Sequence, residues 1–499
     1  MNQPGIASIF SQLSIVDPRL RRLANSAPST LQAGTACVGP DGRVEPPRPI
    51  MPTTTIAYRT MIGLLWGLAL WHSWESRGLF VDGFAFLVQI ARREWFFDFY
   101  APRLYAMVIG QVPVMAALFL GVTDLHLMAR LLSLGLFAVP TALYSLALMR
   151  VKDDAVLLAA VVAAIALVFM TTSFFIVGEY NTAYALSILA AVRLATARRL
   201  ELFDSLMLAA LAFLSMRTYE VMIYLGPMLA GMIFWAIHRA PTRPLLPTAL
   251  HVAAAGMFIA GMVIAAGSIV QPFSEDHLSN TLTTAANFWQ NIQFDMALGA
   301  ALVVVAWALI NPRSLLDARP YRWAGIFLVV LALSPLLAWS DTLIRPLAKS
   351  QYVARTAAGL VIATIIAFIW AYRSSLATRI PALAILGTPV AARRFVAFAL
   401  LMMLACLPSD IYLTRTWISY LEAVHTAVRS QSGVIEFEST SLAKNPHLHL
   451  VEAWILPSQS LALRAKRGDG IIAPPHDFDA WQPFPPERPY PLGSFYWRD

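Results

Sequence analysis

The chain has 499 residues, of which 58% are hydrophobic and only 13% are charged. Soluble globular proteins carry roughly 25% charged residues, so about half of the usual surface charge is missing. This deficit excludes a soluble enzyme and a nucleic-acid-binding protein. Two cysteines are too few for a secreted disulfide scaffold or a cysteine metal cluster.

Long apolar segments alternate with short loops that carry arginine. Apolar segments of about 17 to 25 residues can cross a bilayer as helices. The pattern therefore predicts an all-α polytopic membrane protein. Residues 1–55 precede the first of these segments, and they are polar and rich in proline and arginine. Such a composition cannot bury a core, so we expect a disordered cytoplasmic tail.

The stretch after the first predicted span (56–71) determines the rest of the topology. Residues 73–124 contain many charges and then a second apolar segment, 104–120. If residues 104–120 crossed the bilayer, every later arginine cluster would move to the outer side, against the positive-inside rule. We therefore predict an interfacial helix at 104–120, inside one long external loop that spans 73–124.

With this choice the later loops alternate, and the chain is predicted to have eleven spans with the N-terminus inside and the C-terminus outside. The basic residues of the predicted inner loops are Arg150, Lys152, Arg193, Arg198, Arg199, Arg239, Arg243, Arg313, Arg319, Arg322, Arg373, Arg379, Arg393 and Arg394. The membrane domain is expected to cover 56–407. Residues 408–499, rich in proline and aromatic residues, are expected to form a small external domain.

Ionisable residues gather at the outer ends of the predicted spans. Burying an ionisable side chain near a membrane is costly, so such residues are candidates for a functional site by default. The candidates are Asp82, Glu179, Arg217, Glu220, Arg345, Lys349 and Arg355. A carboxylate can take the proton of an acceptor hydroxyl, and arginines can bind a phosphate bidentately. Apolar helix surfaces can bind a lipid chain. These parts are suited to a reaction on a phosphate-bearing lipid.

We predict that Asp82 and Glu179 are catalytic and that the other five candidates bind substrate. Each residue also has a structural interpretation. Asp82 precedes Gly83 in a common turn pair, and Glu179 is placed to cap the next helix. Arg217 and Glu220 are suited to an ion pair at a helix turn. The three later cations can extend to lipid head groups, and they are Arg345, Lys349 and Arg355.

Over about its first 240 residues the chain resembles the GT-C glycosyltransferases, membrane enzymes that take sugars from polyprenyl-phosphate donors. An acidic residue begins the external loop, in Val81-Asp82-Gly83, and residues 98–105 lead into the interfacial segment. Ala129-Arg130-Leu131-Leu132-Ser133 lies near the start of the second span, and Glu179 follows the third. The family often has an aspartate there, sometimes in a paired-acid motif.

The resemblance implies sugar transfer to an envelope glycan, lipid or protein acceptor on the outer side of a bacterial inner membrane. Direct displacement with Asp82 as base would invert the anomeric carbon. This chain has a single glutamate followed by Tyr180 and Asn181, so we assign no metal ligands and leave a divalent cation open as a cofactor.

Two other functions remain open. An O-antigen-type polymerase or ligase would combine the same parts, but such proteins tend to place their largest external loop late in the membrane domain. A lipid or glycan flippase or transporter predicts polar residues along a central path, often in repeated halves. The early loop around Asp82 and the apolar mid-span positions favour the transferase.

Overall fold

The computed structural model describes residues 37–38, 44–45, 52–173, 178–270, 291–337, 357–444, 450–473 and 492–498. The chain divides into two compact units, Met1–Ile50 and Met51–Asp499. In the first, β1 (Cys37–Val38) pairs with β2 (Val44–Glu45) as antiparallel strands. Most of the predicted N-terminal tail lies outside the described residues.

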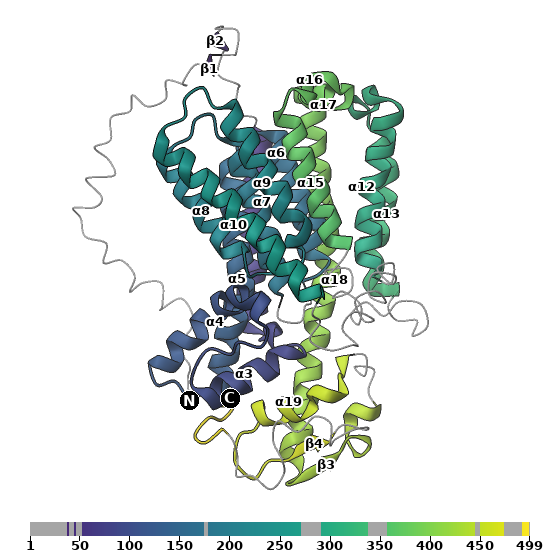
Figure 1. Cartoon of the computed structure of the whole chain (residues 1–499). Coiled ribbons are helices and arrows are strands. Elements are labelled where there is room, and N and C mark those ends of the chain that lie inside the picture. The colour runs from purple at the N-terminus through teal and green to yellow at the C-terminus, as the bar shows by residue number, and fades with distance from the viewer. Residues whose placement is uncertain are drawn as a thin grey trace, which may run out of the picture. The chain divides into compact units, whose positions relative to one another are not determined.

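The second unit is a helical bundle (Figure 1), and a helix lies over each of the eleven predicted apolar segments. These helices are α2 (Pro52–Trp74), α5 (Leu125–Val151), α6 (Ala155–Ala164) with its π-helical continuation η4 (Ile165–Met170), α7 (Glu179–Thr196), α8 (Leu202–Ser215), α9 (Met222–Arg239), α10 (Leu245–Val270), α12 (Ile292–Ile310), α13 (Arg319–Leu337), α15 (Ala357–Arg373) and α18 (Pro389–Ser430). The short helices η6 (Pro312–Leu316), α16 (Leu376–Arg379) and α17 (Pro381–Leu386) join some of them.

The all-α prediction is confirmed, and the chain has the helices of a membrane protein. Among the described residues, five helical segments are long and apolar enough to cross a membrane. They are Ala101–Phe119, Leu125–Val151, Leu245–Val270, Ile292–Ile310 and Pro389–Ser430. The number of spans and the orientation remain predictions.

Burial of each helix follows its place in the bundle. All residues of α7 except Arg193 and Thr196 are buried, because α7 packs against α5, α8, α9 and α15. By contrast, α10 and α12 expose large apolar side chains such as Val263 and Leu302. Exposed apolar faces of this size suit a lipid environment. Figure 1 shows α12 and α13 as a pair at the edge of the bundle, and α13 packs on α18.

The predicted external loop folds into four short helices, η2 (Arg77–Leu79), α3 (Asp82–Arg93), η3 (Ala101–Arg103) and α4 (Leu104–Phe119). A Cβ at Gly135 of α5 would overlap the carbonyl oxygen of Gly110, so these two glycines let α4 pack closely on α5. The helix α4 begins where α8 ends, since Tyr105 N donates to Arg217 O over 2.9 Å. Together with η3 it is one of the segments long and apolar enough to cross a membrane, and its interfacial position remains a prediction.

The last long helix differs from the sequence prediction, which ended it near Leu407. Pro408 lies inside α18, and the helix continues to Ser430. Proline removes one backbone donor and usually kinks or ends a helix. Here the helix continues past Pro408, and it packs against α2, α6 and α13. Consequently the beginning of the predicted external domain is helical.

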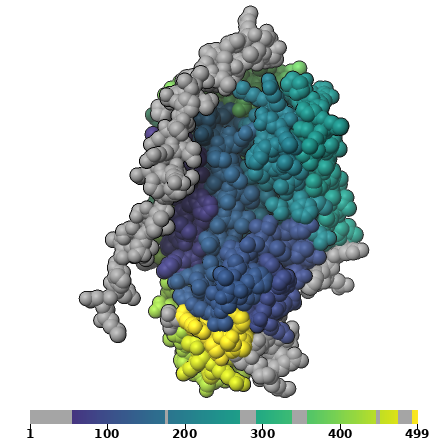
Figure 2. Space-filling view, turned by 90° about the vertical axis from the view of Figure 1, so that its left-hand side faces the viewer, coloured from purple at the N-terminus to yellow at the C-terminus, as the bar shows by residue number. Residues whose placement is uncertain are grey.

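The C-terminal segment consists of short helices and strands, and its last residues contact the end of the predicted external loop. Strand β3 (Val434–Glu436) pairs in parallel with β4 (Ile471–Ala473), and Leu125 N donates to Tyr496 O over 2.9 Å. Figure 2 shows the yellow C-terminal residues against the blue surface of the external-loop region. The helices between the two strands are η7 (Phe437–Ser439), η8 (Ser441–Lys444), η10 (Ala453–Ile455) and α19 (Leu456–Ala462).

Candidate functional site

One arginine of the external loop lies between two carboxylates. The Nε and Nη2 atoms of Arg103 donate to Glu220 Oε1 over 2.9 and 2.7 Å. Its Nη1 atom lies 4.0 Å from Glu179 Oε1. The three side chains are mostly buried, with 14%, 17% and 8% of the surface of Arg103, Glu220 and Glu179 exposed. We call these three residues the Arg103 cluster.

Three separate parts of the chain build this cluster. Arg103 ends η3, Glu179 begins α7, and Glu220 lies in the turn between α8 and α9. Gly178 just before α7 has a φ of 66°, a left-handed conformation that favours glycine. The hydrogen bond of Tyr105 to the α8–α9 turn holds η3 against that turn. The cluster therefore depends on how the external loop docks on the bundle.

Tyrosine rings surround the arginine. The guanidinium of Arg103 lies 4.6 Å from the ring centre of Tyr219 and 5.2 Å from that of Tyr100, within the range of cation–π attraction. Tyr180 contacts the Tyr219 ring edge-on at 5.7 Å. Two carboxylates share one guanidinium, and Glu220 Oε2 has no hydrogen-bond partner among the described residues. The cluster thus contains two carboxylates and one guanidinium, and its side chains are mostly shielded from solvent.

Helix α15 approaches the same tyrosine-rich region. A Cβ at Gly359 would overlap the hydroxyl of Tyr224 and contact that of Tyr184, so a larger residue here would displace the Tyr224 side chain. Three predicted cations, Arg345, Lys349 and Arg355, lie outside the described residues, in the segment that leads into α15.

The opposite face of α15 borders an apolar cavity of about 620 Å³. Its walls come from α6, η4, α12, α15, α17 and α18, and Thr364 is the only polar residue among those that line it. On α15, Leu360 and Val361 face the cavity, whereas Gly359 faces the tyrosines. One helix therefore separates a polar, tyrosine-lined region from a long apolar one.

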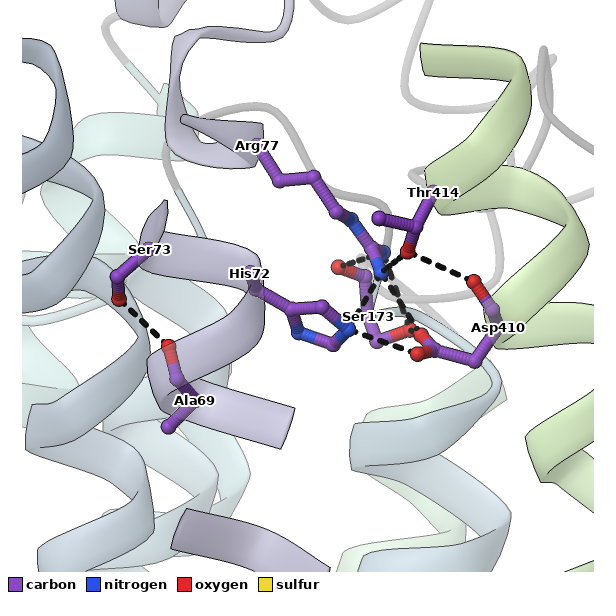
Figure 3. A network of polar contacts seen from close by, with 7 residues as sticks. All are labelled: Ala69, His72, Ser73, Arg77, Ser173, Asp410 and Thr414. Atoms are coloured by element: carbon purple, nitrogen blue, oxygen red, sulfur yellow. Dashed lines mark hydrogen bonds and ion pairs between the residues drawn. The ribbon is translucent and has the colours of Figure 1, made fainter. Parts of the chain in front are cut away.

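A second polar network joins α2, η2, the end of η4 and α18 (Figure 3). Asp410 accepts from Arg77 Nη1 over 2.9 Å and from Ser173 Oγ over 2.7 Å, and its other oxygen lies 2.7 Å from His72 Nε2. Arg77 also donates to Thr414 Oγ1 over 2.8 Å. Side-chain exposure is 0% for Arg77 and 1% for Asp410. We call these five residues the Asp410 network.

This network also supports the start of α3. Gly78 N, next to Arg77, donates to Ser133 Oγ over 3.0 Å. A Cβ at Gly83 would overlap the carbonyl oxygen of Gly78, so the first turn of α3 lies directly on η2. Because Asp82 is the first residue of α3, the buried Arg77 helps to fix the position of Asp82.

The structure brings together two of the predicted site residues, Glu179 and Glu220, around Arg103. Arg217 contributes its backbone carbonyl to Tyr105, and its side chain takes part in none of the ion pairs between described residues. None of the contacts that join the Arg103 cluster involves Asp82. The roles of these residues remain predictions.

Sequence reasoning did not select Arg103 or Asp410. Arg103 stands in a proline-containing loop, where nothing indicates its partners. The predicted end of the last span at Leu407 leaves Asp410 outside it. If the helix is continued through Pro408, Asp410 lies in a helix long and apolar enough to cross a membrane. A carboxylate in such a helix is a candidate functional residue by default.

No protein-family model, curated protein or solved structure matches the chain. In the part of the chain that the structure describes, no group of three histidine, cysteine, aspartate or glutamate side chains is arranged to hold a metal ion. Function must therefore be argued from the two polar clusters and the apolar cavity.

Proposed function

We propose that the protein is an integral membrane glycosyltransferase of a bacterial inner membrane. It would move a sugar from a polyprenyl-phosphate donor to an envelope glycan, lipid or protein on the outer side. The observation that carries the proposal is the Arg103 cluster, in which two mostly buried carboxylates lie beside an arginine of the predicted external loop. The apolar cavity supports it, because a polyprenyl chain needs a long apolar surface beside a polar reaction site.

In the proposed reaction, a carboxylate takes the proton of the acceptor hydroxyl, whose oxygen attacks the anomeric carbon. The bond from that carbon to the phosphate oxygen breaks, and polyprenyl phosphate leaves with the electron pair. Asp82 is the proposed base for this single displacement, which inverts the anomeric carbon. Glu179 is the second catalytic carboxylate, and Glu220 orients Arg103 beside it.

Cations are proposed to bind the phosphate and stabilise its charge as it leaves. The candidates from the sequence are Arg217 and three residues of the segment before α15, namely Arg345, Lys349 and Arg355. Ala357, the first described residue after these cations in the sequence, lines the apolar cavity. We propose that a single donor molecule places its lipid chain in the cavity and its phosphate beside these cations.

The first test compares envelope glycans and glycolipids by mass spectrometry in a strain that lacks the gene. We expect the wild-type gene to restore a missing sugar, and Asp82→Asn, at equal abundance in the membrane, to restore less than about 1% of it, since a positioned base contributes roughly 10²- to 10⁴-fold.

Glu201→Gln is the matched control, because Glu201 is an exposed acidic residue at the start of α8, at the opposite end of that helix from Glu220. It should restore the sugar fully. Equal restoration by Asp82→Asn would remove its catalytic role. A deletion strain that accumulates unpolymerised lipid-linked repeats would favour a polymerase or ligase, and one with every glycan intact would favour transport.

A second prediction concerns divalent cations. The Arg103 guanidinium already supplies positive charge between Glu179 and Glu220, where a metal would have to compete with a permanently charged group. We therefore expect sugar transfer in isolated membranes to continue at an unchanged rate in excess EDTA. A loss that added Mg²⁺ or Mn²⁺ reverses would contradict this prediction.

A further inference from the structure

A second apolar groove lies between α9 and α15, in the halves of these helices that are distant from the Arg103 cluster. Its volume is about 390 Å³, a size typical of binding sites for small molecules. Its lining residues are Met228, Gly231, Met232, Trp235, Ile366, Ala367 and Trp370. None of them lines the larger cavity.

The groove has the form of an open slot with an aromatic end. On α9 the lining residues recur at helical spacing, so they form one stripe. A Cβ at Gly231 would meet nothing within 4 Å, which shows that the slot is open at this point. Trp235 and Trp370 come from opposite walls near the ends of their helices. Tryptophan is enriched at the membrane–water interface.

Arginines lie at the same end of the slot. The guanidinium of Arg239 lies 5.2 Å from the ring centre of Trp235, and its Nη1 atom donates to Arg373 O over 3.2 Å. Arg243 donates to the carbonyl oxygens of Ile237 and His238 over 3.1 and 3.2 Å. These contacts hold two cationic side chains against the last turn of α9.

The arginines at this end differ in their acidic partners. Arg373 pairs with Asp154 over 2.6 Å, but none of the ion pairs between described residues includes Arg239 or Arg243. The hydrogen bond from Arg239 to the backbone of Arg373 brings two arginines together at this end. A bound anion would offset the repulsion between neighbouring cations.

We propose that the α9–α15 groove binds one anionic phospholipid. Its phosphate lies between Arg239 and Arg243, and one acyl chain occupies the slot between Trp235 and Trp370. Basic pockets between membrane helices bind lipid head groups in this way, and the exposed Arg239 lies within reach of a head group at the bilayer surface. The inference does not depend on the proposed enzymatic function.

The test measures binding of dioleoyl phosphatidylglycerol and dioleoyl phosphatidylcholine to the purified full chain in detergent, by native mass spectrometry. Phosphatidylglycerol should bind at least about 10-fold more tightly than phosphatidylcholine, because both lipids carry a phosphate but the quaternary ammonium of phosphatidylcholine is repelled by the neighbouring arginines. Arg239→Gln should remove most of this preference. Gly231→Leu, whose Cβ would meet no atom within 4 Å, should narrow the slot and weaken binding of both lipids.

Arg393→Gln is the matched control, since Arg393 is also exposed and also donates to one backbone carbonyl, that of Pro389. It should leave the affinity unchanged. The proposal is wrong if Arg239→Gln has no more effect than Arg393→Gln. It is also wrong if Gly231→Leu has no effect, because the arginines would then bind phosphate without a lipid chain in the slot.

Discussion

Replacing Asp410 by alanine is expected to lower the free energy of unfolding by about 3 to 5 kcal/mol, the usual cost of leaving one charge of a buried ion pair without its partner. Arg77 would keep its charge in a site where none of its side chain is exposed, and Ser173 and His72 would lose their shared acceptor. The measurement is chemical unfolding of the purified protein in mixed micelles.

Asp98→Ala provides the matched control. Asp98 pairs with Arg93 over 3.3 Å, but the two side chains are 63% and 47% exposed, and exposed pairs contribute about 0 to 1 kcal/mol. If Asp410→Ala cost no more than Asp98→Ala, the network would not stabilise the fold. The double substitution Arg77→Met with Asp410→Leu should recover part of the loss, because it removes both buried charges together.

Replacing Glu179 by glutamine is expected to lower the rate of sugar transfer by about 10²- to 10³-fold, the range for a fixed group whose charge stabilises the transition state. Glu179 lies 4.0 Å from the Arg103 guanidinium, beyond hydrogen-bonding distance, so its contribution to holding Arg103 should be small. Glu220 instead accepts two hydrogen bonds from Arg103. Glu220→Gln should therefore lower the unfolding temperature more than Glu179→Gln does.

The rates of sugar transfer by Glu179→Gln and Glu220→Gln would be measured in membranes from complemented strains, at matched protein abundance. Glu201→Gln is the control for a carboxylate lost elsewhere. If Glu179→Gln kept full activity and lowered only the unfolding temperature, Glu179 would be a helix cap of α7 and not a catalytic group. If both variants kept full activity, the Arg103 cluster would be structural and the proposed site would be wrong.

The sequence alone predicted the all-α fold and the positions of its helices. Apolar segments separated by short arginine-bearing loops are a local signal, and a helix lies over each of them. The same local reasoning selected Glu179 and Glu220, because each is an acidic residue beside an apolar segment. Local signals cannot identify partners, however, and Glu179, Glu220 and Arg103 belong to three separate connections between helices.

Only the tertiary structure decided which charges meet. Arg103 contacts Glu220 across 117 residues of sequence, and Arg77 contacts Asp410 across 333. The docking of η2 and η3 on the bundle makes both contacts, through close approaches such as that of Gly83 to Gly78. Helix formation depends on neighbouring residues, whereas the pairing of buried charges depends on how distant segments pack, and for this reason the sequence predicted the helices but not the ion pairs.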